Sequence, residues 1–255
     1  MTDLATNDAL WLGGVFLLAF LIEAAIGFGS TLVVVSLAAQ VLPLAALLPV
    51  FQPLGMSLSI TIIAREWREV DRAFLLRTVL PAMAPGLVLG MVLFRLGSAD
   101  LLLLVVGVVI ACLAVVELAR LIKDAAPVAL PPAVVRGAFV VAGVIHGLFG
   151  TSGPLVVWAA SHALPEKGRF RATLSFLWLA LSVVLVGGYL ADGTLNPQTA
   201  VLSAKMAPAL LFGYVVGNAL HRSVPQRHFR FAVCVLLVVA GAALVLRAAR
   251  ALMES

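Results

Sequence analysis

Apolar runs long enough to cross a lipid bilayer recur along the whole chain of 255 residues. A membrane-spanning helix needs about 20 predominantly apolar residues. Hydrophobic residues make up 63% of the sequence and charged residues 11%, whereas soluble domains are about half apolar and about a quarter charged. The polar stretches between the runs are too short to form a separate soluble domain. We therefore predict a single all-α integral membrane domain over residues 1–255.

Two of the runs are too long for one span. The runs are Leu10–Val41, Leu44–Ala64, Ala73–Phe94, Leu101–Ile122, Ala133–Leu164, Ala172–Leu190, Gln198–Leu220 and Phe231–Leu246. The first and the fifth extend over about 32 residues, or about 48 Å of straight helix, against a hydrocarbon core of about 30 Å. Each is interrupted by a glycine-rich stretch, IGFGST at 26–31 and GTSGP at 150–154.

The two interruptions belong to an internal repeat. A shift of 123 positions, from 27 to 150, places TLVVV (31–35) over PLVVW (154–158). The same shift places AMAPGLVLG (82–90) over KMAPALLFG (205–213) without a gap. Two matches at one offset indicate a duplication, with repeat 1 at 10–122 and repeat 2 at 133–250.

The loop charges predict that the two repeats have opposite orientations. Lys and Arg gather in the loops at 65–77, 120–136, 167–171 and 222–230, whereas 42–44 and 191–198 have none. By the positive-inside rule the basic loops are cytoplasmic. The first and fifth runs must then enter and return to the same side as helical hairpins, each followed by three spans. This inverted-repeat arrangement places both termini in the periplasm. The alternative is that the glycines only allow close helix packing.

The interruptions are also the candidate binding site. Unwound backbone at membrane depth requires protein or a wet cavity around it. We expect the helices to restart with Ser30 or Thr31 as one N-cap and Thr151 or Ser152 as the other, with Pro154 in the first turn. Two helix N-termini favour an anion. A cation could instead use the carbonyls that end the preceding half-helices, but the sequence has no matched carboxylate cluster to support it.

Several side chains accompany this site. Glu23 and His146 are equivalent under the repeat shift and each lies about one turn before its interruption, so they are candidates either for proton coupling or for bracing the hairpin. Gln52 and Ser175 are equivalent in the same way and are expected to line the cavity. The predicted substrate-binding residues are Gly27, Phe28, Gly29, Ser30, Thr31, Gly150, Thr151, Ser152, Gly153, Pro154, Gln52 and Ser175.

Four segments together resemble the TauE/SafE sulfite exporter family, also called the toluenesulfonate uptake permease family. They are GFGSTLVVVSL (27–37), HGLFGTSGPLVVW (146–158), FRATLSFLWL (170–179) and KMAPALLFG (205–213). The resemblance covers nearly the whole chain. It implies a bacterial inner-membrane transporter of inverted-repeat architecture for sulfite, sulfonates or related organosulfur anions, proton-coupled in some members. Ser30 and Thr31 replace the glycine-richer form of the first motif, which indicates either a different ligand or a different cap.

The predicted function is secondary transport of a small oxyanion. A passive anion channel and a carrier of a non-sulfur carboxylate are the alternatives. An intramembrane enzyme built on His146 and Ser152 would lack a third residue to orient the histidine. With no Walker motif, CxxC pair or carboxylate cluster, we expect no cofactor and no metal ion. The partners are then a small anion and the lipid bilayer, not nucleic acid, and the choice between monomer and homodimer stays open.

Overall fold

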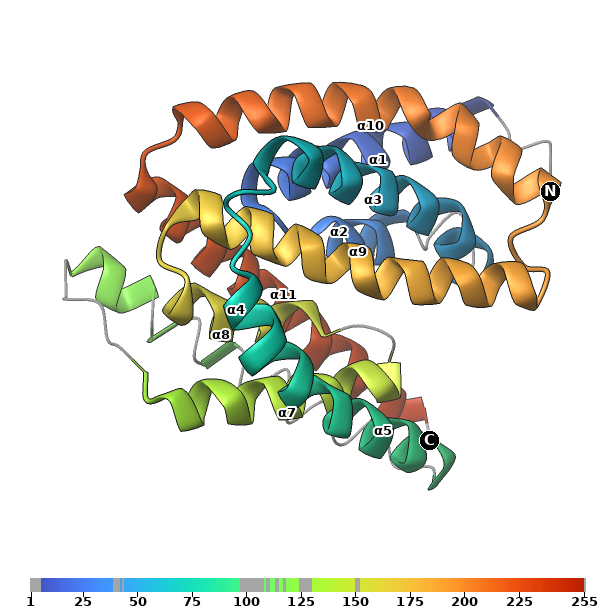
Figure 1. The fold of residues 1–255 in the computed structure, drawn as a ribbon. Coiled ribbons are helices and arrows are strands. Elements are labelled where there is room, and N and C mark those ends of the chain that lie inside the picture. The colour runs from blue at the N-terminus through green and yellow to red at the C-terminus, as the bar shows by residue number, and fades with distance from the viewer. Residues whose placement is uncertain are drawn as a thin grey trace. The chain divides into compact units, whose positions relative to one another are not determined.

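The computed structural model describes residues 6–38, 42, 44–96, 108, 111–112, 115–116, 118–123, 130–149 and 152–254. Every regular element among these residues is a helix, which confirms the all-α prediction. The elements are α1 (Thr6–Ile26), α2 (Ser30–Leu37), α3 (Leu44–Glu66), α4 (Arg72–Phe74), the π-helical η2 (Leu75–Val79), α5 (Leu80–Leu96), α7 (Pro132–Phe149), α8 (Gly153–Ala163), α9 (Lys167–Ala191), α10 (Pro197–Ser223) and α11 (Gln226–Glu254), shown in Figure 1. In this described part, six helical stretches are long and apolar enough to cross a membrane.

Both long runs are split into two helices, as predicted. We call the residues between α1 and α2, 27–29, the first break, and those between α7 and α8, 150–152, the second break. The indole N–H of Trp11, early in α1, donates to the carbonyl of Leu37 at the end of α2 over 3.4 Å, so α2 runs back along α1. The helices α7 and α8 also pack on each other. The predicted fourth run, Leu101–Ile122, lies largely outside the described residues.

The helices group into two compact units. Unit 1 comprises Met1–Val70 and Arg171–Val224, and unit 2 comprises Asp71–Phe170 and Pro225–Ser255. Unit 1 therefore contains the first hairpin with α3, α10 and most of α9. Unit 2 contains the second hairpin with α4, η2, α5 and α11. Each unit combines helices from both predicted repeats, so the units do not coincide with the repeats.

Close helix contacts at glycine join α1 to α10 in unit 1 and α7 to α5 in unit 2. In unit 1, a β-carbon at Gly213 of α10 would lie 2.9 Å from both Leu17 O and Leu21 N of α1. In unit 2, a β-carbon at Gly86 of α5 would lie 2.1 Å from Val140 O and 3.0 Å from Val144 N of α7. The shift of 123 positions relates Leu17 to Val140 and Leu21 to Val144. The glycines themselves are not equivalent, because the shift relates Gly213 to Gly90 and not to Gly86. Equivalent helix pairs still pack in both units, which supports the internal duplication, whereas the opposite orientation of its halves stays a prediction.

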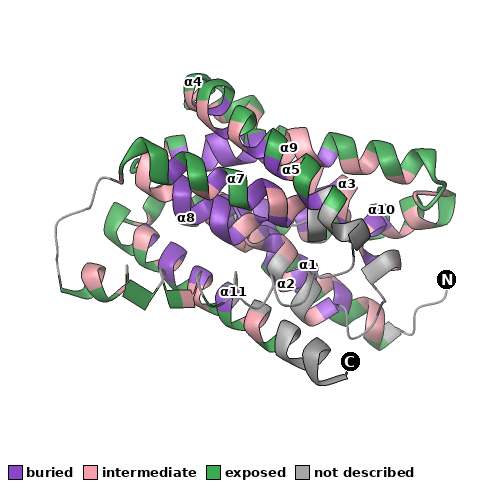
Figure 2. Cartoon of the chain, turned by 90° about the horizontal axis from the view of Figure 1, so that it is seen from below, coloured by how far each residue is buried: buried purple, intermediate pink, exposed green. Residues whose placement is uncertain are grey.

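The two units bury different parts of their hairpins. In unit 1, Phe16 and Phe20 of α1 pack with Phe51 of α3, and the rings of Phe20 and Phe51 are stacked with centroids 5.4 Å apart. In unit 2, every residue of α8 from Pro154 to Ala160 is buried (Figure 2). A helix that is apolar on all sides is buried on all sides, so α8 is an internal arm rather than a lipid-facing one.

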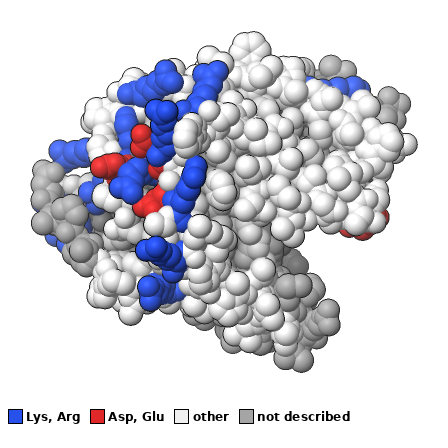
Figure 3. Space-filling view, viewed as in Figure 1, with Lys and Arg blue, Asp and Glu red and all other residues white. Residues whose placement is uncertain are grey.

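Helices α3 and α9 of unit 1 run antiparallel. Glu66 at the end of α3 pairs with Arg171 near the start of α9, and Gln52 further back on α3 bonds Ser182 further along α9. The Arg171 contacts also bring in Asn218, near the end of α10. Blue basic side chains gather at this end of unit 1 in Figure 3, where Arg65 closes α3 and Arg222 closes α10. The helix ends predicted to face the cytoplasm in unit 1 therefore lie at one end.

Candidate functional site

The first break depends on two glycines with left-handed backbone. Gly27 has φ +96° and Gly29 has φ +105°, a region that residues with a β-carbon rarely adopt. A β-carbon at Gly27 would also lie 2.9 Å from the Cα of Arg171. Gly29 is the N-cap of α2, so the prediction that Ser30 or Thr31 caps this helix is wrong. The left-handed glycine starts the helix one residue earlier, and the Ser30 hydroxyl donates instead to the carboxylate of Glu23.

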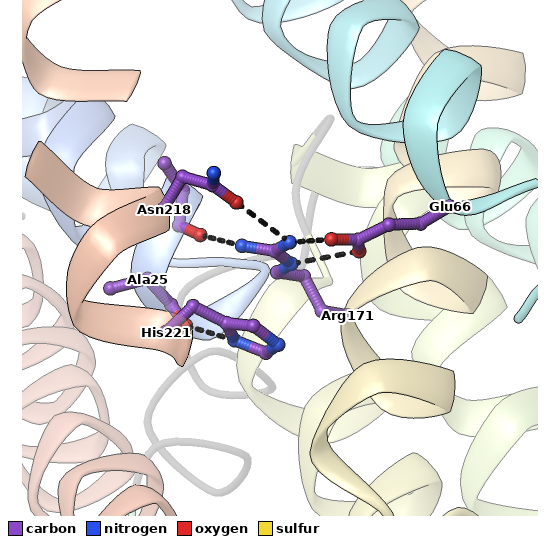
Figure 4. A network of polar contacts seen from close by, with 6 residues as sticks. Ala25, Glu66, Arg171, Asn218 and His221 are labelled. Atoms are coloured by element: carbon purple, nitrogen blue, oxygen red, sulfur yellow. Dashed lines mark hydrogen bonds and ion pairs between the residues drawn. The ribbon is translucent and has the colours of Figure 1, made fainter. Parts of the chain in front are cut away.

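The carbonyls that end α1 are occupied by protein donors. The Nη1 of Arg171 donates to Ala24 O over 2.7 Å, and the Nδ1 of His221 lies 2.8 Å from Ala25 O (Figure 4). The indole N–H of Trp178 donates to Gly27 O over 2.9 Å. A cation at this helix end would need the same oxygens. The contacts therefore favour the anion interpretation of the first break over the cation alternative.

Arg171 is the centre of the network that fixes the first break. Its side chain is 1% exposed, and its Nε donates to Glu66 Oε2 over 3.0 Å while Nη2 donates to Glu66 Oε1. Nη2 also donates to Asn218 Oδ1 over 3.1 Å. One guanidinium therefore joins α3, α9, α10 and the end of α1. Sequence reasoning missed this role because Arg171 appeared as the last basic residue of a cytoplasmic loop.

At the N-terminal end of α2 the backbone groups without a helical partner are N–H donors, in contrast to the carbonyl acceptors at the end of α1. The first helical bond in this segment runs from Val33 N to Gly29 O over 3.2 Å, so the N–H groups of Ser30, Thr31 and Leu32 have no acceptor within the helix. No side chain among the described residues caps this end. Free N–H donors and the positive end of the helix dipole favour an anion here.

Each predicted ionisable residue meets a serine across its own break. Glu23, 6% exposed, accepts from Ser30 in unit 1. In unit 2, His146 Nδ1 lies 3.4 Å from the hydroxyl of Ser152. This pairing supports the bracing role, because a side chain before the break holds one after it. Proton coupling stays a proposal.

The remaining predicted site residues divide between the units. Ser152 occupies the N-cap of α8, although its hydroxyl makes no capping bond, and Pro154 lies in the first turn with Gly153, as expected. Phe28 is 2% exposed, Thr31 is partly buried and Ser175 is fully buried. Gln52 Nε2 donates to Ser182 Oγ over 3.0 Å. The predicted residues Gly150 and Thr151 lie outside the described residues.

A small cavity in unit 2 lies at the far end of α8 from its break. Its walls include Trp158, Ser161, His162, Phe170 and Arg230. None of the predicted substrate-binding residues lines it. Trp158 is buried and lines this cavity.

A protein-family model for the sulfite exporter TauE/SafE family matches residues 12–244. The chain belongs to the sulfite exporter TauE/SafE family. This membership confirms the resemblance seen in the four sequence segments. Both glycine-rich breaks and five of the six apolar stretches long enough to span a membrane start within the matched region, and the first stretch, Asn7–Ile26, overlaps it.

A match to one curated protein gives a narrower comparison. Over 103 residues the TauE/SafE chain is 28% identical to the "Probable inner membrane transporter protein TsaS" of Comamonas testosteroni. The aligned part covers 40% of this chain and 43% of that protein, so the match spans less than half of either. No solved structure matches the chain.

Removing the Arg171 side chain should destabilise the protein strongly. Arg171→Met leaves the Glu66 carboxylate without its guanidinium and Ala24 O without its donor, and breaking a buried pair in this way costs about 3–5 kcal/mol. The matched control is Arg169→Met, because Arg169 pairs with Asp71 over 2.7 Å while 47% exposed, and such a pair contributes about 0–1 kcal/mol. Unfolding in detergent measures both variants. The double variant Arg171→Met/Glu66→Leu should recover part of the loss, and equal stability of the two single variants would contradict the assigned role.

Proposed function

We propose that this TauE/SafE family member is a secondary transporter that moves a small oxyanion across the bacterial inner membrane. The substrate is sulfite, a sulfonate or a related organosulfur anion. The observation that carries the proposal is the asymmetry of the first break. Its carbonyl side is closed by Arg171, His221 and Trp178, while its N–H side has no side-chain cap.

The chemistry of the first break suits an anion with several oxygens. Backbone N–H groups at the start of α2 and nearby hydroxyls are donors that can each bond a separate oxygen. Glycine at 27 and 29 lets a ligand approach the backbone, because no side chain holds it away. A sulfite or sulfonate group presents three oxygens and a charge, which uses more of these donors than a carboxylate does.

Discontinuous helices favour a transporter over a passive channel. Transporters with internal repeats commonly place the substrate between broken helices, and the protein opens to one side at a time. The two hairpins and the packing of equivalent helix pairs, α1 with α10 and α7 with α5, fit that architecture. A channel would show flux that does not saturate and that cannot be driven uphill by a second gradient. A preference for acetate over sulfite would instead identify a carboxylate carrier.

The proximity of His146 and Ser152 also raises the enzyme alternative. Their side chains lie 3.4 Å apart across the second break. In unit 1 the equivalent residue Glu23 makes the same kind of contact with Ser30, and a carboxylate–serine pair is not a nucleophile–base pair of the histidine type. The shared geometry is therefore better explained by bracing of the two hairpins.

Bulky side chains at the breaks should abolish transport. Gly153→Leu is the cleaner variant, since a β-carbon at Gly153 meets no atom within 4 Å and the protein should still fold. Gly29→Leu additionally forces a branched side chain into the left-handed region. Uptake of radiolabelled sulfite into proteoliposomes is the assay, and Gly188→Leu, at an exposed and open position of α9, is the control. Full activity of both break variants would overturn the proposal.

A proton-coupled mechanism assigns a specific role to Glu23. Glu23→Gln keeps the shape of the side chain and a hydrogen bond with Ser30, but it removes the carboxylate that can bind and release a proton. If Glu23 carries the coupling proton, sulfite transport by this variant should lose its dependence on an imposed pH gradient while sulfite binding persists. The measurement is uptake with and without the gradient, beside wild-type protein. An unchanged response to the gradient removes Glu23 from this role and leaves the bracing role.

Both termini should face the periplasm in the inverted-repeat topology. Alkaline phosphatase fused after the last residue of the chain, Ser255, should be active, because that enzyme folds only outside the cytoplasm. A fusion in the basic loop at 65–72 should be inactive by the same logic. The reverse pattern of activity would contradict the proposed orientation.

A further inference from the structure

Helices α3 and α9 face each other with polar residues along the contact. On α3, Gln52, Ser59 and Glu66 follow one another at intervals of seven residues and therefore share one face. On α9, Arg171, Ser175, Trp178 and Ser182 share one face for the same reason. The outer members are bonded across the contact, Glu66 to Arg171 and Gln52 to Ser182. Ser59 and Ser175 lie between these two bonds.

The internal repeat relates Ser175 and Ser59 to the hydrogen-bonded residues Gln52 and Ser182. The shift of 123 positions turns Gln52 into Ser175 and Ser59 into Ser182. The equivalent of the Gln52–Ser182 pair is therefore Ser175–Ser59. Gln52 reaches Ser182 over 3.0 Å, whereas Ser175, whose side chain is shorter than glutamine, makes no hydrogen bond with Ser59. The two pairs lie on either side of the middle of both helices.

The hydroxyls of Ser59 and Ser175 have no hydrogen-bond partner. They are the buried side-chain polar atoms left unpaired among the described residues, and the two serines are 1% and 0% exposed. Other helical serines differ, because the hydroxyls of Ser57 and Ser223 each donate to the carbonyl one turn earlier. Leaving a buried hydroxyl unpaired destabilises a fold, so two of them on the helix faces that Gln52–Ser182 and Glu66–Arg171 join require an explanation.

We propose that Ser59 and Ser175 form a hydroxyl pair that donates to two oxygens of the transported oxyanion. This inference rests on the proposed function and locates a substrate subsite within unit 1, near the middle of α3 and α9. Ser59 is then a specificity-determining residue that sequence analysis did not identify. The substrate oxygens act as the acceptors here, as the Ser182 hydroxyl oxygen does for the Gln52 amide in the equivalent pair.

The surroundings favour an anion over a cation at this pair. Arg171 lies one turn before Ser175 on the same face, and the same α9 face contacts the first break through Arg171 and Trp178. The carboxylate on this α3 face, Glu66, is engaged by Arg171. Glu23 of the first break is engaged by Ser30. Both hydroxyls are covered in this conformation, and access requires the helices around the first break to part, which alternating access provides.

Three variants test the hydroxyl pair with sulfite as the probe. Ser59→Ala and Ser175→Ala remove one donor each, and Ser175→Gln recreates the residue present in the equivalent pair and should bond Ser59. Sulfite affinity is measured from its effect on the melting temperature of purified full-length protein, and KM from proteoliposome uptake. Ser57→Ala on α3 and Ser223→Ala on α10 are controls, because both hydroxyls are bonded to their own helices and exposed.

Each alanine variant should bind sulfite about tenfold or more weakly, the usual effect of losing one hydrogen bond to a charged group. Without sulfite, it should melt at the wild-type temperature or above, since an unpaired hydroxyl has been removed. Ser175→Gln should be more stable and should not bind sulfite. The controls should match wild type.

Two results would overturn the proposed hydroxyl pair alone, without affecting the proposed function. Wild-type sulfite affinity in Ser59→Ala and Ser175→Ala would remove the serines from the subsite while leaving the proposed function intact. Lower melting temperatures without sulfite would show that the hydroxyls support the fold through bound water instead. If wild-type protein neither binds nor transports sulfite, thiosulfate, sulfoacetate or taurine, the proposed function fails, and the hydroxyl pair fails with it.

Discussion

A helix that ends inside a membrane exposes carbonyls that protein donors or a wet cavity must satisfy. In this chain one buried guanidinium meets that requirement at the first break, where Arg171 bonds Ala24 O while Glu66 and Asn218 hold it in place. The ring nitrogens of His221 and Trp178 bond the neighbouring carbonyls of Ala25 and Gly27. The position of α2, and therefore of its free N–H groups, depends on this network. Because the donors come from α9 and α10, the break forms only when distant parts of the chain pack against the first hairpin.

This arrangement determines which sign of ligand charge the first break favours. The carbonyl end of α1 is closed by donors, one of them cationic, and the N–H end of α2 has no side-chain cap among the described residues. Two further buried hydroxyls in unit 1 are unpaired, Ser175 on the face of α9 that contacts the break and Ser59 on α3. Both can donate to a ligand oxygen. Such a setting stabilises an anion with several oxygens and explains why a broken helix persists in an apolar chain.

Sequence analysis predicted the features that depend on local pattern. Hydrophobic length predicted the helices, and glycine-rich interruptions predicted both hairpins, because these follow from residues close in the sequence. The repeat shift correctly associated Glu23 with His146. The N-cap of α2 was predicted wrongly at Ser30 or Thr31, since the left-handed backbone of Gly29 and the reach of Ser30 to Glu23 depend on three-dimensional packing. Arg171 was missed for a similar reason, because its partners Glu66 and Asn218 lie far away in the sequence.

We propose that an oxyanion binds in unit 1 beside the first break and the hydroxyl pair. Selenite has the charge and pyramidal shape of sulfite, and selenium scatters X-rays anomalously. Anomalous diffraction from crystals grown with selenite would locate the ion directly. We predict a selenium peak within hydrogen-bonding reach of the Ser59 and Ser175 hydroxyls. A selenium peak at the cavity around His162 and Arg230, with none beside α3 and α9, would contradict it.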